Sequence, residues 1–188
     1  PMLPTPIAIV VTGTPPATAT ATATPAPTAT PLPGAATGVN APLVNFNPVI
    51  KEFGTYGQGN GQFEFPQVAL QDSLGNYYVS DGNNTRISKW GPDMQYKTFF
   101  GFGAVDGALN LPRGIWMDKK DCLVVADAVG SIIRGYDVSR EEPQFSYSIG
   151  IFGPGEGQFS YPMDVFIDGT GRLYIADREN FRIQVWSY

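Results

Sequence analysis

The sequence contains no histidine among its 188 residues. This absence excludes zinc sites with histidine ligands, Ser–His and Cys–His nucleophile pairs, and the usual general base of hydrolases. The single cysteine, Cys122, provides no disulfide framework, and we expect it to be a structural thiol at the start of a strand. We therefore predict a protein that is not an enzyme and has no cofactor and no catalytic or metal site. An enzyme that relies on carboxylates alone is the alternative.

Charged residues are absent from the first 50 positions, because all 17 acidic and 12 basic residues lie at or after Lys51. The net charge is −5, and the basic residues are scattered except for the pair Lys119 and Lys120. Nucleic-acid surfaces need clustered basic residues, so we expect no nucleic-acid partner. Long apolar runs are also lacking: residues 7–11 fall far short of the roughly 20 needed for a transmembrane helix. We predict no membrane span in this chain.

The composition divides the chain into two parts. Residues 1–42 are rich in Pro, Thr and Ala and have few large side chains to bury, so we predict an extended arm or stalk. Residues 43–188 are rich in Gly, aromatic and β-branched residues. They are numerous enough to form one packed module.

A repeat organises the second part. The segment F-G-T-Y-G-Q-G-N-G-Q-F-E-F-P at 53–66 returns as I-G-I-F-G-P-G-E-G-Q-F-S-Y-P at 149–162, and a looser copy spans 99–133. The matching prolines are 46 and then 50 residues apart: Pro66, Pro112 and Pro162. A repeat of this length that is built of short strands is typical of a propeller or an array.

Each repeat predicts a meander of short strands. In the first repeat, runs of β-forming residues at 68–70, 77–79, 86–90 and 96–99 are separated by turns rich in Gly, Asn and Asp. Four antiparallel strands in a meander make one propeller blade. The predicted blades lie at about 66–101, 112–150 and 162–188. The third blade lacks a fourth strand.

The repeats resemble the NHL repeat family. The first repeat carries the matching residues Gly57, Gly59, Gly61, Gln62, Phe63, Pro66, Asp72, Gly75, Asn76, Tyr78, Val79, Asp81, Asn84, Arg86 and Ile87. The third carries Gly153, Gly155, Gly157, Gln158, Phe159, Pro162, Asp168, Gly171, Tyr174, Ile175, Asp177, Asn180, Arg182 and Ile183. The second departs from the pattern, with Gly130 and Ile132 where Asn and Arg are expected. The resemblance covers residues 49–188 and implies an all-β fold of β-propeller blades.

The resemblance also implies a ring of six blades, whereas this chain carries three. We expect half of a six-bladed ring, so that two copies of the chain close one ring. An orphan outer strand precedes the first repeat and is expected to complete the third blade of the other copy. This assembly strand comprises Val49, Ile50, Lys51, Glu52 and Phe53. An open array that continues into a fibre, or a chain cut from a longer propeller, are the alternatives.

Two sets of aspartates recur at fixed positions of the repeats: Asp72, Asp118 and Asp168, and Asp81, Asp127 and Asp177. Because they recur in every blade, we expect them to accept hydrogen bonds from backbone amides in turns. Arg86 and Arg182 are expected to pair with nearby carboxylates or carbonyls. Calcium held by the carboxylates is the alternative to this structural role.

The arm and one turn carry candidate glycosylation sites. Candidates for O-linked sugars are Thr18, Thr20, Thr22, Thr24, Thr28 and Thr30, which suit a surface stalk. Asn83 begins the N-glycosylation pattern Asn-Asn-Thr in a turn that is expected to be exposed. The arm has a second interpretation, in which it docks on a neighbouring subunit by adding a strand.

We predict from these features a structural protein located outside the cell or on its surface. Self-association through shared blades and the arm, into a filament or a surface layer, is the expected function, with another copy as partner and glycans on the arm. The alternative is a cell-surface propeller that binds a peptide or glycan ligand, with the arm as its stalk.

Overall fold

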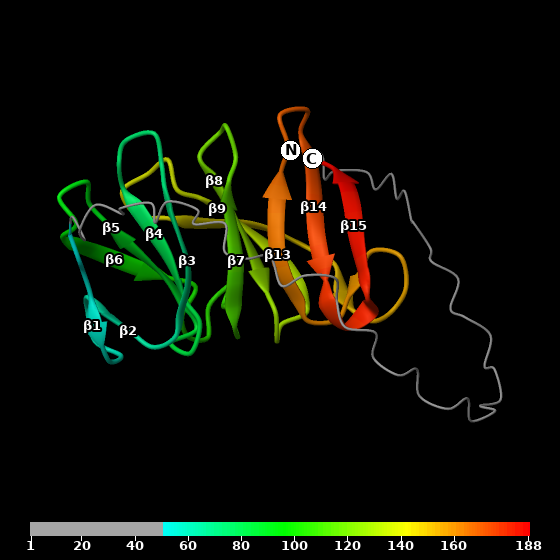
Figure 1. Cartoon of the computed structure of the whole chain (residues 1–188), viewed down its shortest axis with the longest axis horizontal. Helices are drawn as coiled ribbons and strands as arrows, with labels where there is room; N and C mark the ends of the chain where they lie inside the picture. The colour runs from blue at the N-terminus through cyan, green and yellow to red at the C-terminus, as the bar shows by residue number, and fades with distance from the viewer. Residues whose placement is uncertain (1–50) are drawn as a thin grey trace, which may run out of the picture. The chain divides into compact units, whose positions relative to one another are not determined.

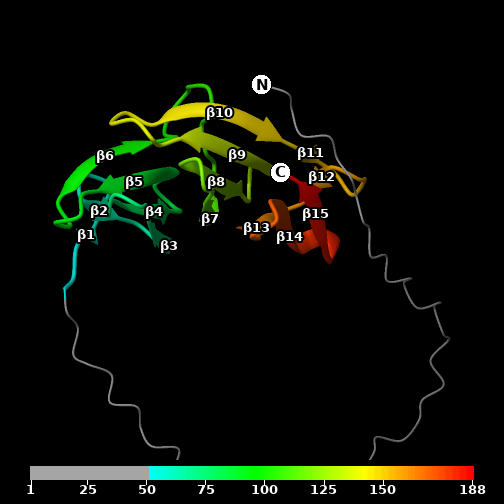
Figure 2. The same cartoon turned by 90° about the horizontal axis from the view of Figure 1, so that it is seen from above.

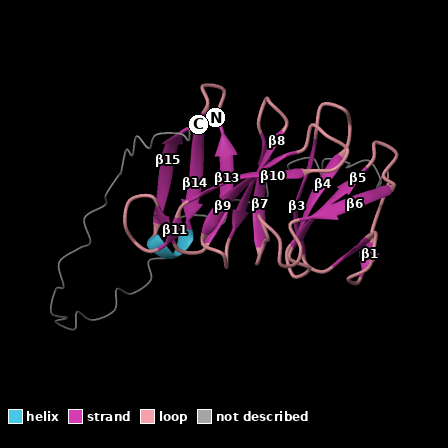
Figure 3. Cartoon of the chain, turned by 180° about the vertical axis from the view of Figure 1, so that it is seen from behind, coloured by secondary structure: helices cyan, strands magenta, loops and turns pink. Residues whose placement is uncertain are grey.

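The computed structural model describes residues 51–188, which form strands and turns (Figure 1). One 3-10 helix, Arg178–Asn180, is the only helix in this part of the chain (Figure 3). The all-β prediction is confirmed. The predictions for the arm threonines, and for Val49 and Ile50, fall outside the described residues.

The first blade is an antiparallel sheet of four consecutive strands. Its strands are β3 (Pro66–Gln71), β4 (Tyr77–Asp81), β5 (Arg86–Trp90) and β6 (Tyr96–Phe100). The innermost strand begins at the repeated proline, two residues earlier than predicted, and its register with β4 shifts between Pro66 and Ala69. Proline is tolerated as the first residue of a strand because its missing N–H costs no ladder bond there.

The second blade has the same order of strands. It comprises β7 (Pro112–Met117), β8 (Cys122–Asp127), β9 (Ile132–Asp137) and β10 (Gln144–Ile149). Pro112 again starts the innermost strand, and the same register shift follows it.

The third blade has three strands among the described residues. These are β13 (Pro162–Ile167), β14 (Arg172–Asp177) and β15 (Arg182–Ser187), with β15 at the edge of the sheet. The prediction of a missing fourth strand therefore holds within residues 51–188.

The predicted strand at 49–53 is not observed over Lys51–Phe53, where the backbone has no strand assignment. A strand is defined by its pairing, and no described strand of the chain pairs with these residues. Short parallel pairs that we did not predict follow in the linkers. They join β1 (Thr55–Tyr56) to β2 (Gln62–Phe63), and β11 (Ile151–Phe152) to β12 (Gln158–Phe159).

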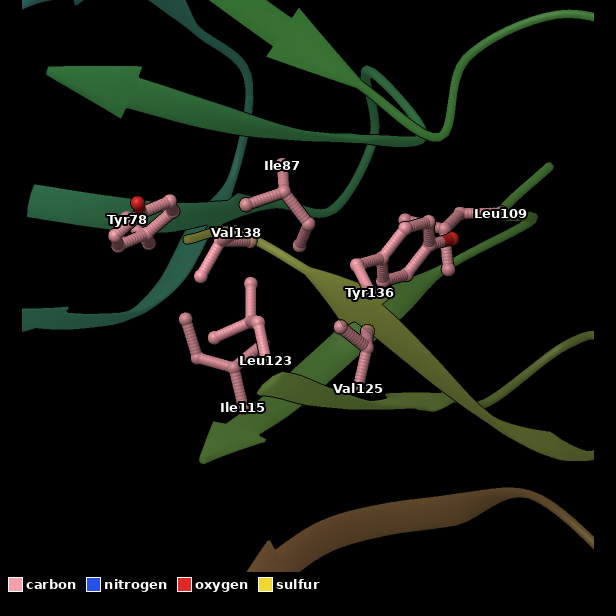
Figure 4. Close-up of a cluster of buried hydrophobic side chains, with 8 residues drawn as sticks. All are labelled: Tyr78, Ile87, Leu109, Ile115, Leu123, Val125, Tyr136 and Val138. Carbon is pink, nitrogen blue, oxygen red and sulfur yellow. The ribbon is translucent and has the colours of Figure 1, made fainter. Parts of the chain in front are cut away.

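The sheets lie side by side, with β3, β7 and β13 at their inner edges and β6 and β10 at their outer edges (Figure 2). Apolar side chains of neighbouring sheets form one buried cluster at each junction. The first cluster joins Tyr78 and Ile87 of the first blade to Leu123 and Val125 of the second (Figure 4). The second joins Val124, Ala126 and Ile133 of the second blade to Val165, Leu173 and Ile175 of the third.

Candidate functional site

An aspartate–asparagine–arginine cluster ties the first blade to the linker that precedes it. The Asp81 carboxylate is fully buried and accepts bonds from Asn84 Nδ2 at 2.7 Å and Arg86 Nε at 3.0 Å. The Arg86 guanidinium donates in turn to the carbonyls of Gln58, Gly59 and Gln62. These donors and acceptors satisfy one another, so the cluster is structural.

The third blade repeats this arrangement. Asp177 accepts bonds from Asn180 Nδ2 and Arg182 Nε, both at 2.9 Å, and Arg182 Nη2 donates to the carbonyls of Gly155 and Gln158. The expected roles of Arg86 and Arg182 are confirmed. The second blade differs, because Ile132 replaces the arginine. There, Arg134 supplies the positive charge, with its Nε 3.7 Å from the Asp127 carboxylate.

The other aspartate set makes turns before the second strand of each blade. Asp168 Oδ1 accepts the amides of Thr170 and Arg172, and Asp72 and Asp118 accept equivalent amides. The amide of Arg172 and the hydroxyl of Thr170 lower the pKa of Asp168, because both stabilise its carboxylate. Across residues 51–188, no three acidic or thiol side chains group as a metal site.

Cys122 lies half-buried at the start of β8, as expected, in a cluster of aromatic hydroxyls. The Tyr147 hydroxyl donates to Tyr188 Oη at 3.0 Å, and the Tyr188 hydroxyl donates to the Asp118 carboxylate at 3.1 Å. Burial raises the pKa of the Cys122 thiol and of both tyrosines. A neutral thiol is a poor nucleophile, which agrees with a structural role for Cys122.

No described strand covers the face of the third blade that points away from the second, which is called the open face below. Its β14 and β15 residues Tyr174, Ala176 and Ile183 correspond to Tyr78, Ser80 and Ile87 of the first blade. In the first blade, all three are fully buried against the second blade. In the third blade, Ile183 is 56% exposed, and Tyr174 and Ala176 are partly exposed.

A groove of about 1090 Å³ runs over this open face. Its lining includes Tyr174, Ala176, Ile183 and Val185. Phe181 also lines it and is 92% exposed in a left-handed conformation (φ 53°), where the other blades have Thr85 and Ser131. An exposed phenylalanine beside an apolar face is a feature of contact surfaces. Sequence reasoning missed this face, although the aromatic residue in the turn was a signal.

The groove reaches β15, whose outer edge is unpaired among residues 51–188. Within the described chain, β15 pairs only with β14, whereas the equivalent strands β5 and β9 are paired on both sides. A free edge presents a row of unpaired N–H and C=O groups, which is a template for another strand. The candidate functional site therefore combines an apolar face with an unpaired strand edge.

The candidate N-glycosylation residue Asn83 lies away from this face, in the first blade. Asn83 is exposed in the turn between β4 and β5, and its amide is 3.5 Å from the Glu64 carboxylate. Trp116 is partly buried against the third blade, with its ring 4.7 Å from that of Phe166. No helix in residues 51–188 has the length and apolarity to cross a membrane.

Comparisons with known proteins agree with the repeat structure. Residues 159–186, which span β13, β14 and most of β15, match the family model of the NHL repeat. No curated protein sequence matches the chain.

Solved structures of other proteins are similar as well, among them the following three. A structural genomics protein of unknown function from Bacteroides thetaiotaomicron is 23% identical, with a TM-score of 0.48 over 60% of this chain and 32% of its own. A streptogramin B lyase is 14% identical, with a TM-score of 0.49 over 65% and 40%. A catalytically inactive virginiamycin B lyase from Staphylococcus aureus with quinupristin is 13% identical, with a TM-score of 0.46 over 70% and 43%. The chain thus spans less than half the length of each. The third blade is an NHL repeat, which confirms the resemblance found in the sequence.

Proposed function

We propose that this chain is a non-enzymatic structural module that associates with other copies of itself through the open face of its third blade. The observation that carries the proposal is the exposure of Ile183, whose equivalents Ile87 and Ile133 are completely buried. Fully burying one such side chain contributes roughly 1.5–3 kcal/mol. An apolar face with a free strand edge gains stability when a matching blade covers it.

The chemistry of the described side chains supports a non-enzymatic role. The chain has no histidine, and the buried carboxylates of Asp81 and Asp177 are held by arginine and asparagine donors. Groups already satisfied in this way are poorly suited to proton transfer or metal binding. We assign the recurring aspartates to the scaffold.

We place the protein outside the cell or on its surface. The uncharged Pro/Thr/Ala arm at residues 1–42 and the exposed Asn83 both suit glycosylation in that location. Intact-mass measurement of the protein purified from its natural source tests this location. We expect added sugar mass that falls when Asn83→Gln removes the acceptor. A mass equal to that of the bare polypeptide would contradict the assignment.

Two substitutions test self-association. We expect the full chain to have the mass of two or more copies in light scattering, and Ile183→Asp to shift it to one copy, because a buried charge would oppose the contact. Ile151→Asp is the matched control: Ile151 is 64% exposed, lies outside the open face, and should leave the mass unchanged. An unaltered mass for Ile183→Asp would exclude this face from assembly.

A second candidate function, ligand binding at a cell surface, has one observation in its favour. An aromatic groove of about 480 Å³ lies between β6 and β10, lined among others by Phe99, Phe102, Val105 and Phe145. Phe102 and Val105 are more than half exposed. Aromatic grooves of this kind suit proline-rich peptides. Saturable binding of such a peptide, lost in Phe102→Ala, would favour this function.

A further inference from the structure

We infer that Lys51–Phe53 of one copy pairs with β15 of a second copy as its missing outer strand, in antiparallel register, with Phe53 opposite Ile183. Glu52 then lies opposite Gln184, and Lys51 lies opposite Val185. This inference rests on the proposed self-association and specifies the segment that each copy contributes. The occupant of the free edge is a second copy of this chain.

The backbone after Phe53 has the form of a strand exit. In the two complete blades, the outer strand ends at Phe100 or Ile149. A glycine with positive φ follows each end: Gly101 (80°) and Gly150 (86°). Gly54 has the same conformation (84°) after Phe53. At each of the three glycines, a Cβ atom would collide with a side chain of the linker that follows: Phe63, Leu109 or Phe159. Phe53 therefore occupies the last position of an outer strand.

The side chain of Phe53 makes the contacts that such a position requires. Its ring centroid lies 4.9 Å from that of Trp90 in the first blade. Phe100, the last residue of β6, lies in the same way 5.0 Å from Tyr136 of the second blade. The end of an outer strand thus packs on the blade that follows it. Phe53 thus contacts the blade that follows it. Among the described residues, no strand of a preceding blade pairs with its segment.

The register follows from the complete blades. Phe100 lies opposite Ile87 in the pair β5–β6, and Ile149 lies opposite Ile133 in the pair β9–β10. Both isoleucines are fully buried. The equivalent residue of β15 is Ile183. Phe53 opposite Ile183 is therefore the pairing that reproduces both internal junctions.

Charge complementarity supports this register. In the first blade, Phe99 covers the Arg86 guanidinium, with 4.9 Å from Cζ to the ring centroid. The residue equivalent to Phe99 in the proposed strand is Glu52, and the residue equivalent to Arg86 is Arg182. The Arg182 side chain is 17% exposed, against 4% for Arg86. Pairing of the two copies in this register therefore places the Glu52 carboxylate of one copy beside Arg182 of the other, which is still partly open to solvent.

Cysteine cross-linking between two separately made chains tests the register. In a Cys122→Ser background, one chain carries Lys51→Cys and the other carries Val185→Cys. Residues directly opposite in antiparallel strands have Cα atoms about 4.5–5.5 Å apart, within the range of a disulfide. The matched control pairs Lys51→Cys with Ser187→Cys, which is two residues out of register and leaves Ile183 in place. Diagonal neighbours of this kind are about 7–8 Å apart, which is too far for a disulfide.

We expect the Lys51→Cys and Val185→Cys mixture to give a covalent dimer after mild oxidation, at least tenfold more than the control mixture. Equal or stronger cross-linking in the control would overturn the register. If the background protein forms oligomers by light scattering but neither mixture cross-links, strand exchange is wrong while self-association stands. If the background protein and the unmodified chain are both folded monomers, both proposals fail.

Discussion

Ile87 and Ile183 occupy the same position of the first and third repeats, yet Ile87 is completely buried and Ile183 is 56% exposed. The difference arises because the second blade covers Ile87, whereas no described strand covers Ile183. Since Ile133 of the second blade is also fully buried, the exposure is a property of the last blade and not of the position. The third blade thus presents the same type of surface that forms the two internal junctions.

The buried pair of Asp81 and Arg86 should be essential for the stability of the first blade. Asp81→Asn is expected to lower the free energy of unfolding by about 3 kcal/mol, because it leaves the buried Arg86 charge uncompensated. Denaturant unfolding measures this change. Asp106→Asn, in an exposed loop, is the control and should change the free energy of unfolding by less than about 0.5 kcal/mol. Equal stability of the two variants would contradict the structural role of Asp81.

Alkaline conditions should destabilise the fold. Burial raises the pKa of Tyr136, Tyr147 and Tyr188 above the usual value, so the folded state keeps protons that the unfolded chain releases above pH about 10. The contribution of these tyrosines to the free energy of unfolding is therefore complete below pH about 10. It decreases as the pH rises further, by up to about 1.4 kcal/mol per pH unit for each tyrosine.

Tyr147→Phe tests this pH dependence. The variant should show a shallower loss of unfolding free energy between pH about 10 and about 11, because one titrating group has been removed. Tyr56→Phe, at a side chain that is 83% exposed, is the control and should keep the slope of the unmodified protein. The idea fails if Tyr147→Phe has the same slope as this control.

The arm is expected to organise copies beyond the shared blades. Deletion of residues 1–42 leaves the proposed assembly strand in place, so the truncated chain should still pair through the third blade. Higher assemblies, which we assign to arm docking, should be lost. Light scattering and electron microscopy of the two proteins compare their size and order. If both remain the same after truncation, the arm is not an assembly device.

Much of the fold was predictable, because local chemistry determines it. The repeated prolines indicate the spacing of the blades, and the Asp81 and Arg86 motif indicates their anchors, without any tertiary information. The innermost strands begin at these prolines, two residues earlier than predicted. Arg134 was not predictable as the replacement partner of Asp127, because it lies two positions away from the arginine of the motif. The parallel pair β1–β2 was also missed, since two-residue strands have no periodicity.

The candidate site was the least predictable part. Ile87 and Ile183 stand in the same motif, so the sequence alone does not distinguish a covered isoleucine from an exposed one. Burial depends on what packs against the residue, which is a tertiary property. The predicted assembly strand at 49–53 stays a prediction, supported by the positive φ of Gly54 and by the contact between the Phe53 and Trp90 rings.

Sedimentation velocity of the full, unmodified chain over a dilution series tests the central claim most directly. The account predicts a species with at least twice the mass of one chain at micromolar concentration. This species should dissociate to single chains on dilution. A single species with the mass of one chain, fully folded at every concentration, would contradict it.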